Sequence, residues 1–316
     1  MDHFRSIKML RKSFLIFLSF YTLGLSAQDF EPRFLSNVPV NSNFVLASYI
    51  YSAGNILIDN TLPIDDLNST LHSSGIAYAR SLKFLNKLSK FDVVLPVSYA
   101  RFNGIYEGDE ASTSRSGLAD PMIRFAMILI GVKPLSLEEF VKAERKKFRL
   151  GVQMRLRIPL GQYDETKFLN LGANRWALRT GVAASYNLKN KFIFELQLNN
   201  WLFTENNAFF NGNTIKQKPL ISVQTHITYI IKPGIWIAAS MSRSGLGETI
   251  INDVEQNNNQ KNSRYGATFA YRLNKQNALK FSYSSGITTR YGADFTSFII
   301  AYQYMWIDKP KKKHHY

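Results

Sequence analysis

Arginines recur at alternate positions in two neighbouring stretches of this chain. Arg155 and Arg157 are two residues apart, and Arg179 lies within a second alternating stretch. A spacing of two places side chains on one face of a β-strand. Guanidinium groups stay charged at any working pH and bind carboxylates through paired hydrogen bonds. These arginines therefore predict a polar face that holds acidic side chains or attracts anionic solutes.

The other alternating stretches also carry polar residues on the face that these arginines occupy. Its charged, amide and imidazole side chains are predicted to line a solute path, and they are Arg80, Asp92, Arg124, Arg155, Arg157, Arg179, Glu195, Gln197, Gln224, His226 and Arg264, with Arg272 and Lys280 at the same parity. Basic residues outnumber acidic ones in this set, so we expect a cationic path that prefers anions. Asp92 and Glu195 are expected to pair with some arginines. The alternative is that all of these residues serve as structural ion pairs.

His226 is the candidate for catalysis, because Ser222 shares its parity and a Ser–His pair can supply nucleophile and base. However, the chain contains no nucleophile-elbow sequence. His72, His226, His314 and His315 do not have the spacing of a metal site. We therefore predict that the protein is not an enzyme and has no cofactor or metal site. The alternative is a barrel enzyme that acts on lipid.

The stretch from Phe148 to Tyr186 shows which elements carry this polar face. Apolar and polar residues alternate over 148–158 and again over 176–186, like the two arms of a hairpin. In a soluble sandwich the apolar face would be the core, whereas in an outer-membrane barrel it would meet lipid and the polar face would line a lumen. Similar patterns predict strands at 43–53, 73–83, 89–102, 120–130, 148–160, 176–186, 191–204, 219–231, 235–244, 263–273, 278–287 and 294–306.

The connections between these strands alternate between long and short. External loops are predicted at 54–72, 103–119, 161–175, 205–218 and 245–262, with a short last loop at 288–292. Periplasmic turns are predicted at 85–88, 187–190, 232–234 and 274–277, and the long second connection carries a helix near 134–147 with a Ser136–Glu139 capping box. Pro96 and Pro159 fall within strands and predict a bulge or kink. This pattern predicts an all-β fold, a transmembrane antiparallel up-and-down β-barrel of about 12 strands.

The first residues predict export. Residues 1–27 combine a basic start, an apolar run from Phe14 to Leu25 and a small-residue cleavage site, as in a signal peptide. The apolar run is shorter than the roughly 20 residues of a spanning helix. The predicted organisation is a signal peptide at 1–27, a periplasmic or luminal segment at 28–42, the barrel at 43–307 and a basic tail at 308–316. Prolines in 28–42 exclude a regular strand, and we expect this segment to plug the lumen in part.

The net charge of +16 is distributed unevenly. The predicted external loops are acidic, whereas the periplasmic segments and the strands are basic. Because the basic residues are spread over strands rather than gathered in one patch, nucleic acid is not expected as a partner. The last strand alternates aromatic and apolar residues up to Tyr304 and Trp306, which suits an interfacial girdle and recognition by the barrel-assembly machinery. Outer-membrane lipid and lipopolysaccharide are the expected surroundings.

Short motifs in order along the mature chain carry a family resemblance. They are Glu31–Arg33, Asn37–Phe44, Asp92–Pro96, Gly117–Pro121, Pro159–Asp164, Asn170–Trp176, Leu202–Asn206, His226 with Tyr229, Arg264–Ala267 and Thr289–Phe295. The sequence resembles the bacterial outer-membrane family of transporters linked to the meta-pathway of phenol degradation. The resemblance implies a β-barrel in the cell outer membrane and passage of small hydrophobic or aromatic compounds, and it implies no catalytic residues. The lysine-rich tail and the Asn-rich loop at 257–260 lie outside the pattern.

The sequence thus predicts an outer-membrane channel for passive uptake of small solutes, including hydrophobic or aromatic anions. Besides the lipid-acting enzyme, a second alternative is a structural or surface-binding barrel. A lumen filled completely by the N-terminal segment would distinguish that alternative from a channel.

Overall fold

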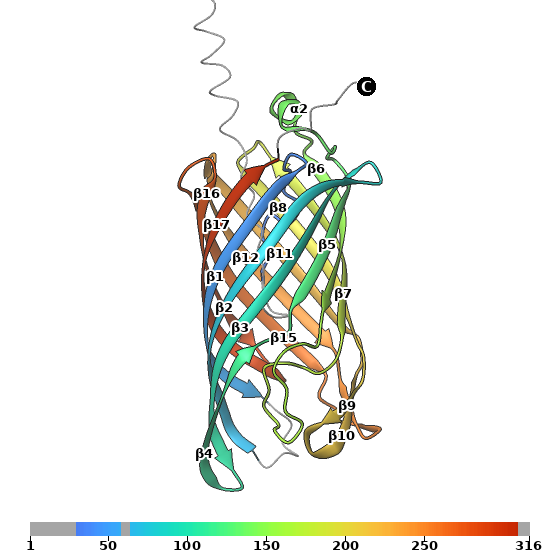
Figure 1. Ribbon diagram of the computed structural model, residues 1–316, viewed down its shortest axis with the longest axis vertical. Helices are drawn as coiled ribbons and strands as arrows, with labels where there is room; N and C mark the ends of the chain where they lie inside the picture. Colours follow the sequence, from blue (N-terminus) through green and yellow to red (C-terminus); the bar gives the residue numbers. More distant parts are fainter. Residues whose placement is uncertain (1–29, 58–63, 309–316) are drawn as a thin grey trace, which may run out of the picture.

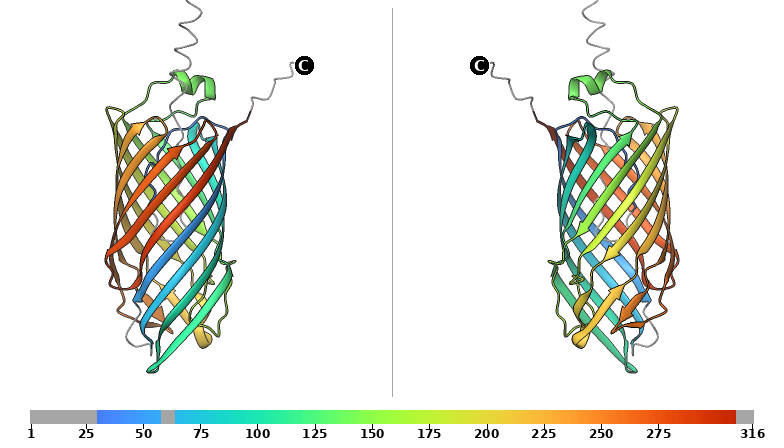
Figure 2. Two further views of the ribbon diagram at one scale, coloured as in Figure 1. Left: turned by 90° about the vertical axis from the view of Figure 1, so that its left-hand side faces the viewer. Right: turned by 90° about the vertical axis from the view of Figure 1, so that its right-hand side faces the viewer.

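The structure, a computed structural model, describes residues 30–57 and 64–308, so the predicted signal peptide and the tail beyond residue 308 lie outside the described residues. One antiparallel sheet closes into a tall barrel of tilted strands (Figures 1 and 2). Its strands are β1 (Ser42–Leu57), β2 (Ile64–Phe84), β3 (Lys87–Tyr106), β4 (Asp109–Leu118), β5 (Met122–Ile130), β6 (Phe148–Arg157), β7 (Ala177–Leu188), β8 (Phe192–Phe203), β11 (Leu220–Lys232), β12 (Ile235–Leu246), β15 (Gln260–Arg272), β16 (Asn277–Thr288) and β17 (Gly292–Ile307).

The sheet closes through pairing of β1 with both β17 and β2. β4 and β5 pair one after the other with β3, so these two of the 13 strands occupy a single position and twelve positions surround the lumen. The predicted all-β antiparallel barrel is confirmed. Pro96 of β3 lies where its neighbour changes from β5 to β4, and its carbonyl accepts a hydrogen bond from the Ala119 N–H at 3.0 Å. A proline fits there because it has no N–H to offer the interrupted neighbour.

The two faces of the sheet are inverted relative to those of a water-soluble protein. On β8, Leu196 and Leu198 point outward and are 43% and 50% exposed, whereas Glu195 and Gln197 point inward and are buried. A band of exposed apolar and aromatic side chains around a polar interior is what a lipid environment requires. Within the described residues, no helix is long and apolar enough to cross a membrane.

The barrel end that carries the predicted external loops, which we call the external end, contains more strand than predicted. β1, β2, β3 and β4 extend into the predicted loops 54–72 and 103–119, and the β3–β4 hairpin projects beyond the rest of the barrel (Figure 1). The predicted loops 205–218 and 245–262 contribute β9 (Asn206–Phe209), η1 (Phe210–Gly212), β10 (Asn213–Gln217), β13 (Thr249–Ile251) and β14 (Val254–Glu255), whose strands form a second, four-stranded sheet. The first four residues of β4 are all exposed, and β10 and β13 are half-buried throughout, so burial does not alternate along these stretches. The period-two pattern therefore could not reveal them.

Two predicted strand ends were also wrong. β6 ends at Arg157, so Pro159 lies after the strand and not in a kink within it, and β7 begins after Trp176. At the opposite end of the barrel, the predicted helix is α2 (Leu137–Lys142), which is shorter than the predicted 134–147. The Ser136–Glu139 capping box is present, and it fixes where the helix begins.

Candidate functional site

A row of charged side chains crosses four neighbouring strands at mid-barrel. Asp92 of β3 is directly opposite Arg124 of β5, which is opposite Arg155 of β6, which is opposite Arg179 of β7. All four side chains are buried in the lumen. Like charges directly opposite each other in a sheet repel, so this row requires negative charge from elsewhere.

The N-terminal segment supplies this negative charge. The Glu31 carboxylate, which is only 1% exposed, accepts hydrogen bonds from Arg124 at 2.8 Å and from Arg155, and lies 3.5 Å from the terminal nitrogen of Arg179. Arg124 also bonds Asp92 at 2.7 Å. Three arginines from three adjacent strands thus converge on one carboxylate. Hydrogen bonds between ionised partners are the strong ones, and a buried pair depends on such bonds to offset desolvation.

Residues 30–41 form a segment inside the barrel, which we call the luminal segment, and its backbone is fixed by the wall. The Gln197 amide donates to the Glu31 carbonyl at 3.0 Å, Lys90 donates to the Phe34 carbonyl at 3.3 Å, and Arg149 donates to the Leu35 carbonyl at 3.1 Å. Glu195 accepts a hydrogen bond from the Arg33 N–H. The wall therefore holds this irregular backbone at the points where a strand neighbour would have paired with it.

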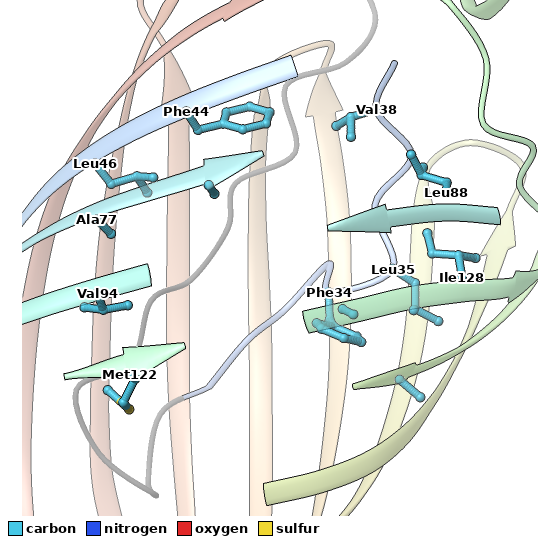
Figure 3. Close-up of a cluster of buried hydrophobic side chains, with 13 residues drawn as sticks. Phe34, Leu35, Val38, Phe44, Leu46, Ala77, Leu88, Val94, Met122 and Ile128 are labelled. Atoms are coloured by element: carbon cyan, nitrogen blue, oxygen red, sulfur yellow. The ribbon is translucent and has the colours of Figure 1, made fainter. Parts of the chain in front are cut away.

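Apolar contacts complete the attachment of the luminal segment. Phe34, Leu35 and Val38 are buried against inward-facing apolar residues near the periplasmic end (Figure 3). The labelled wall residues of this cluster are Phe44, Leu46, Ala77, Leu88, Val94, Met122 and Ile128. Burial of each large apolar side chain contributes about 1.5–3 kcal/mol. The luminal segment and the wall thus form a small apolar core inside the barrel.

His226 has a serine partner other than the one predicted. Its Nδ1 lies 2.8 Å from the Ser240 hydroxyl, and its Nε2 lies 3.3 Å from the Gln197 amide nitrogen. The Phe30 ring packs edge-on against the imidazole, with the ring centroids 6.1 Å apart. His226 and Ser240 are buried, so this pair lies deep in the lumen beneath the luminal segment and away from lipid.

An open cavity of about 280 Å³ remains on the external side of the luminal segment. One part of its wall carries serines, two pairs of which are hydrogen-bonded at 2.7–2.8 Å: Ser52 with Ser297 and Ser73 with Ser98. Most of the remaining lining is apolar. Asn170 also lines the cavity, and Arg264 reaches its wall, where it donates to the Phe295 carbonyl at 2.5 Å. We call this space the external cavity; its apolar lining includes Ile50, Ile56, Leu71, Phe102, Leu171 and Phe295.

The remaining predicted site residues divide into those near the cluster and those distant from it. Gln224 is buried in the lumen, and Arg157 lies 3.8 Å from Asp120 near the external end of β6. Arg80 does not line the lumen interior: it pairs with Asp308 at 2.7 Å, and both side chains are about 40% exposed at the periplasmic end. A residue with inward parity near the end of a strand thus lies at the mouth of the barrel and not along the solute path.

Sequence reasoning missed several buried residues of this site. Lys90 and Arg149 have the inward parity of their strands, so the pattern that selected Arg155 could have selected them. Glu31, Arg33 and Ser240 had no such signal, because the luminal segment does not alternate and small hydroxyls are common on the inward face. No three His, Asp or Glu side chains come together as a metal site in the part of the chain that the structure describes.

Comparisons with known proteins agree with this architecture. The model of the family described as "Putative MetA-pathway of phenol degradation" matches residues 51–302. The outer membrane channel from Pseudomonas putida F1 superposes with a TM-score of 0.73 at 17% identity, covering 88% of this chain and all of that one. The β domain of the Bordetella autotransporter BrkA gives a TM-score of 0.51 at 14% identity, covering 84% of this chain and all of that domain. No curated protein matches. These structural likenesses show the fold of an outer-membrane β-barrel.

Proposed function

The chain belongs to this family, as the resemblance of its motifs predicted, and from this premise we propose that it is an outer-membrane channel for passive uptake of small solutes, in particular hydrophobic or aromatic anions. The solute crosses the membrane through the lumen after the luminal segment has moved aside. The proposal adds two elements to the family assignment, the class of solute and the gate.

The observation that carries the proposal is the capture of one carboxylate by three arginines. Glu31 lies where Arg124, Arg155 and Arg179 converge, so the lumen contains a carboxylate-binding site that the chain itself fills. A solute carboxylate presents the same two oxygens to the same guanidinium groups. An anionic solute therefore competes with Glu31, and its binding favours displacement of the luminal segment.

The external cavity supports an amphipathic solute. Its volume of about 280 Å³ is just below the roughly 300–1,000 Å³ of pockets for drug-sized ligands. Serine hydroxyls on one side and apolar side chains on the other match a molecule with a polar group on an aromatic or aliphatic body. Because this cavity is open, the luminal segment fills only part of the lumen, which favours a channel over a purely structural barrel.

The contacts of His226 favour passage over catalysis. Its Ser240 partner is buried in the lumen and Phe30 packs against the imidazole, whereas a lipid substrate would reach the outer face. The nearest carboxylate across the strand pair, Glu195, accepts its hydrogen bond from the Arg33 N–H. The pair thus serves to order the wall beneath the luminal segment.

Uptake of radiolabelled benzoate into proteoliposomes tests the proposal. We expect faster, saturable uptake of benzoate than of benzylamine, a cation of similar size. The variant R155Q/R179Q should lower the ratio of benzoate to benzylamine uptake severalfold, whereas R115Q, which removes a charge at the external end, should not. Benzoate uptake no faster than benzylamine uptake, or an equal uptake ratio in wild type and R155Q/R179Q, would refute the anion-selective channel.

A further inference from the structure

A second cavity, of about 290 Å³, opens at the periplasmic end of the barrel. Five basic residues line it, and none of the described residues around it is a carboxylate: Arg33, Arg145, Arg149, Lys191 and Lys232. Arg33 belongs to the luminal segment, Arg145 to the connection that follows α2, and Arg149 to β6. Lys191 lies in the β7–β8 turn and Lys232 at the end of β11. We call this space the basic cavity. Its charge density is unlike that of the external cavity, where Arg264 is the sole basic lining residue.

Two of these arginines are buried and incompletely bonded. Arg33 is 8% exposed and Arg149 is 4% exposed, and the Nε–H of each has no hydrogen-bond partner within the described residues. Arg149 donates to the Leu35 carbonyl, while the Arg33 guanidinium lies over the Trp236 ring at 5.3 Å. A buried donor without a partner is costly, and a planar guanidinium is matched by the paired oxygens of a carboxylate or phosphate.

Glu195, the neighbouring acid, does not balance the positive charge of these arginines. Burial lowers the pKa of Arg33 to about 10; Glu195 opposes that change, and repulsion from Arg149 and Arg145 adds to it. Burial and then Arg149 lower the pKa of Arg145 to about 10 as well. Glu195 is a single carboxylate that already accepts the Arg33 backbone N–H. Glu195 thus brings one negative charge to the positive charges of Arg33 and Arg149.

We propose that the basic cavity binds a small oxyanion of the phosphate or carboxylate type, and that this anion locks the luminal segment in place. The anion bridges Arg33 of the segment, Arg145 of the connection after α2 and Arg149 of the wall. A ligand that binds only the docked arrangement stabilises it in proportion to its occupancy. The site lies at the opposite side of the luminal segment from the external cavity and is independent of the solute proposed above. Anions on the periplasmic side then keep the channel closed.

Calorimetric titration of the purified full barrel with inorganic phosphate, in phospholipid-free detergent, tests the site. Wild type should bind phosphate saturably, and R145Q/R149Q should bind it at least tenfold more weakly. K189Q is the matched control, because Lys189 is in the same turn as Lys191 but does not line the cavity. Equal affinity in wild type and R145Q/R149Q, or binding lost equally in K189Q, would overturn the proposal.

Two further experiments distinguish lost binding from misfolding, and free phosphate from a lipid headgroup as the ligand. K232Q changes one exposed side chain that lines the cavity and should weaken phosphate binding severalfold even if R145Q/R149Q fails to fold. In wild type, phosphate should slow maleimide labelling of a cysteine introduced by S36C in the luminal segment, and benzoate should do so less at equal concentration. Binding to nanodiscs of anionic phospholipid with no response to free phosphate would instead indicate a lipid site and overturn the luminal one.

Discussion

Replacing Glu31 with Gln should release the luminal segment while leaving the barrel intact. Glu31 is buried and is shared by Arg124, Arg155 and Arg179, so the substitution removes the carboxylate common to these three guanidinium groups, while Asp92 still pairs with Arg124. Breaking a buried ion pair by removing one partner costs about 3–5 kcal/mol. Because each 1.4 kcal/mol is a factor of ten, the displaced population should rise by roughly two to three orders of magnitude. The strands themselves keep their ladder of hydrogen bonds.

Cysteine accessibility measures this displacement directly. The chain has no cysteine, so S36C introduces a single thiol at a position that is 3% exposed in the docked segment. When opening is fast relative to labelling, the maleimide rate follows the open population. E110Q, at the exposed tip of the β3–β4 hairpin, is the matched control and should leave the rate unchanged. A maleimide labelling rate in S36C/E31Q within about twofold of the rate in S36C would refute the assignment of Glu31 as the main anchor. In a double-mutant cycle, R155Q should cost much less in the E31Q background than alone.

Three further outcomes are expected. Deleting residues 30–41 should raise single-channel conductance and shift the reversal potential toward chloride, more so at low ionic strength, because the arginines lose Glu31; an unchanged conductance in a folded variant would contradict the plug. Cysteines introduced by D109C and N257C should react with impermeant reagents on intact cells, whereas K189C should not, and the reverse pattern would invert the topology. R80Q should change stability to heat or denaturant by at most about 1 kcal/mol, since its pair with Asp308 is part-exposed, and a larger loss would mean that this contact is structurally important.

Sequence alternation was sufficient for the barrel because lipid and lumen impose a period of two on every spanning strand. It assigned Arg124, Arg155 and Arg179 to the interior, and all three are buried there. It could not give their register, since parity says which face a residue is on but not which residue is opposite. The alignment of these arginines in one row is therefore visible only in the structure.

Alternation also failed where its physical cause is missing. The first four residues of β4, Asp109–Ser112, are exposed on both faces, so they are under no constraint to alternate, and they were predicted as loop. The luminal segment is held by side chains of the wall and has no strand neighbour, so its key residue, Glu31, had no periodic signal. A shortage of acids on the predicted inward face, against many arginines, was the one sequence hint that a carboxylate must come from elsewhere.

The seam between β1 and β17 has a consequence for the order in which the molecule assembles. Asn43 bonds Asp308 across a sequence separation of 265, so the seam joins the two ends of the barrel-forming chain. Contacts so distant in sequence are slow to form, because the loop that they close is long. The luminal segment precedes β1 directly, yet Glu31 binds β5, β6 and β7, far from the seam around the circumference. Its docking therefore joins β1 to the far wall through a much shorter loop, and we expect this contact to shorten the search for the seam during folding.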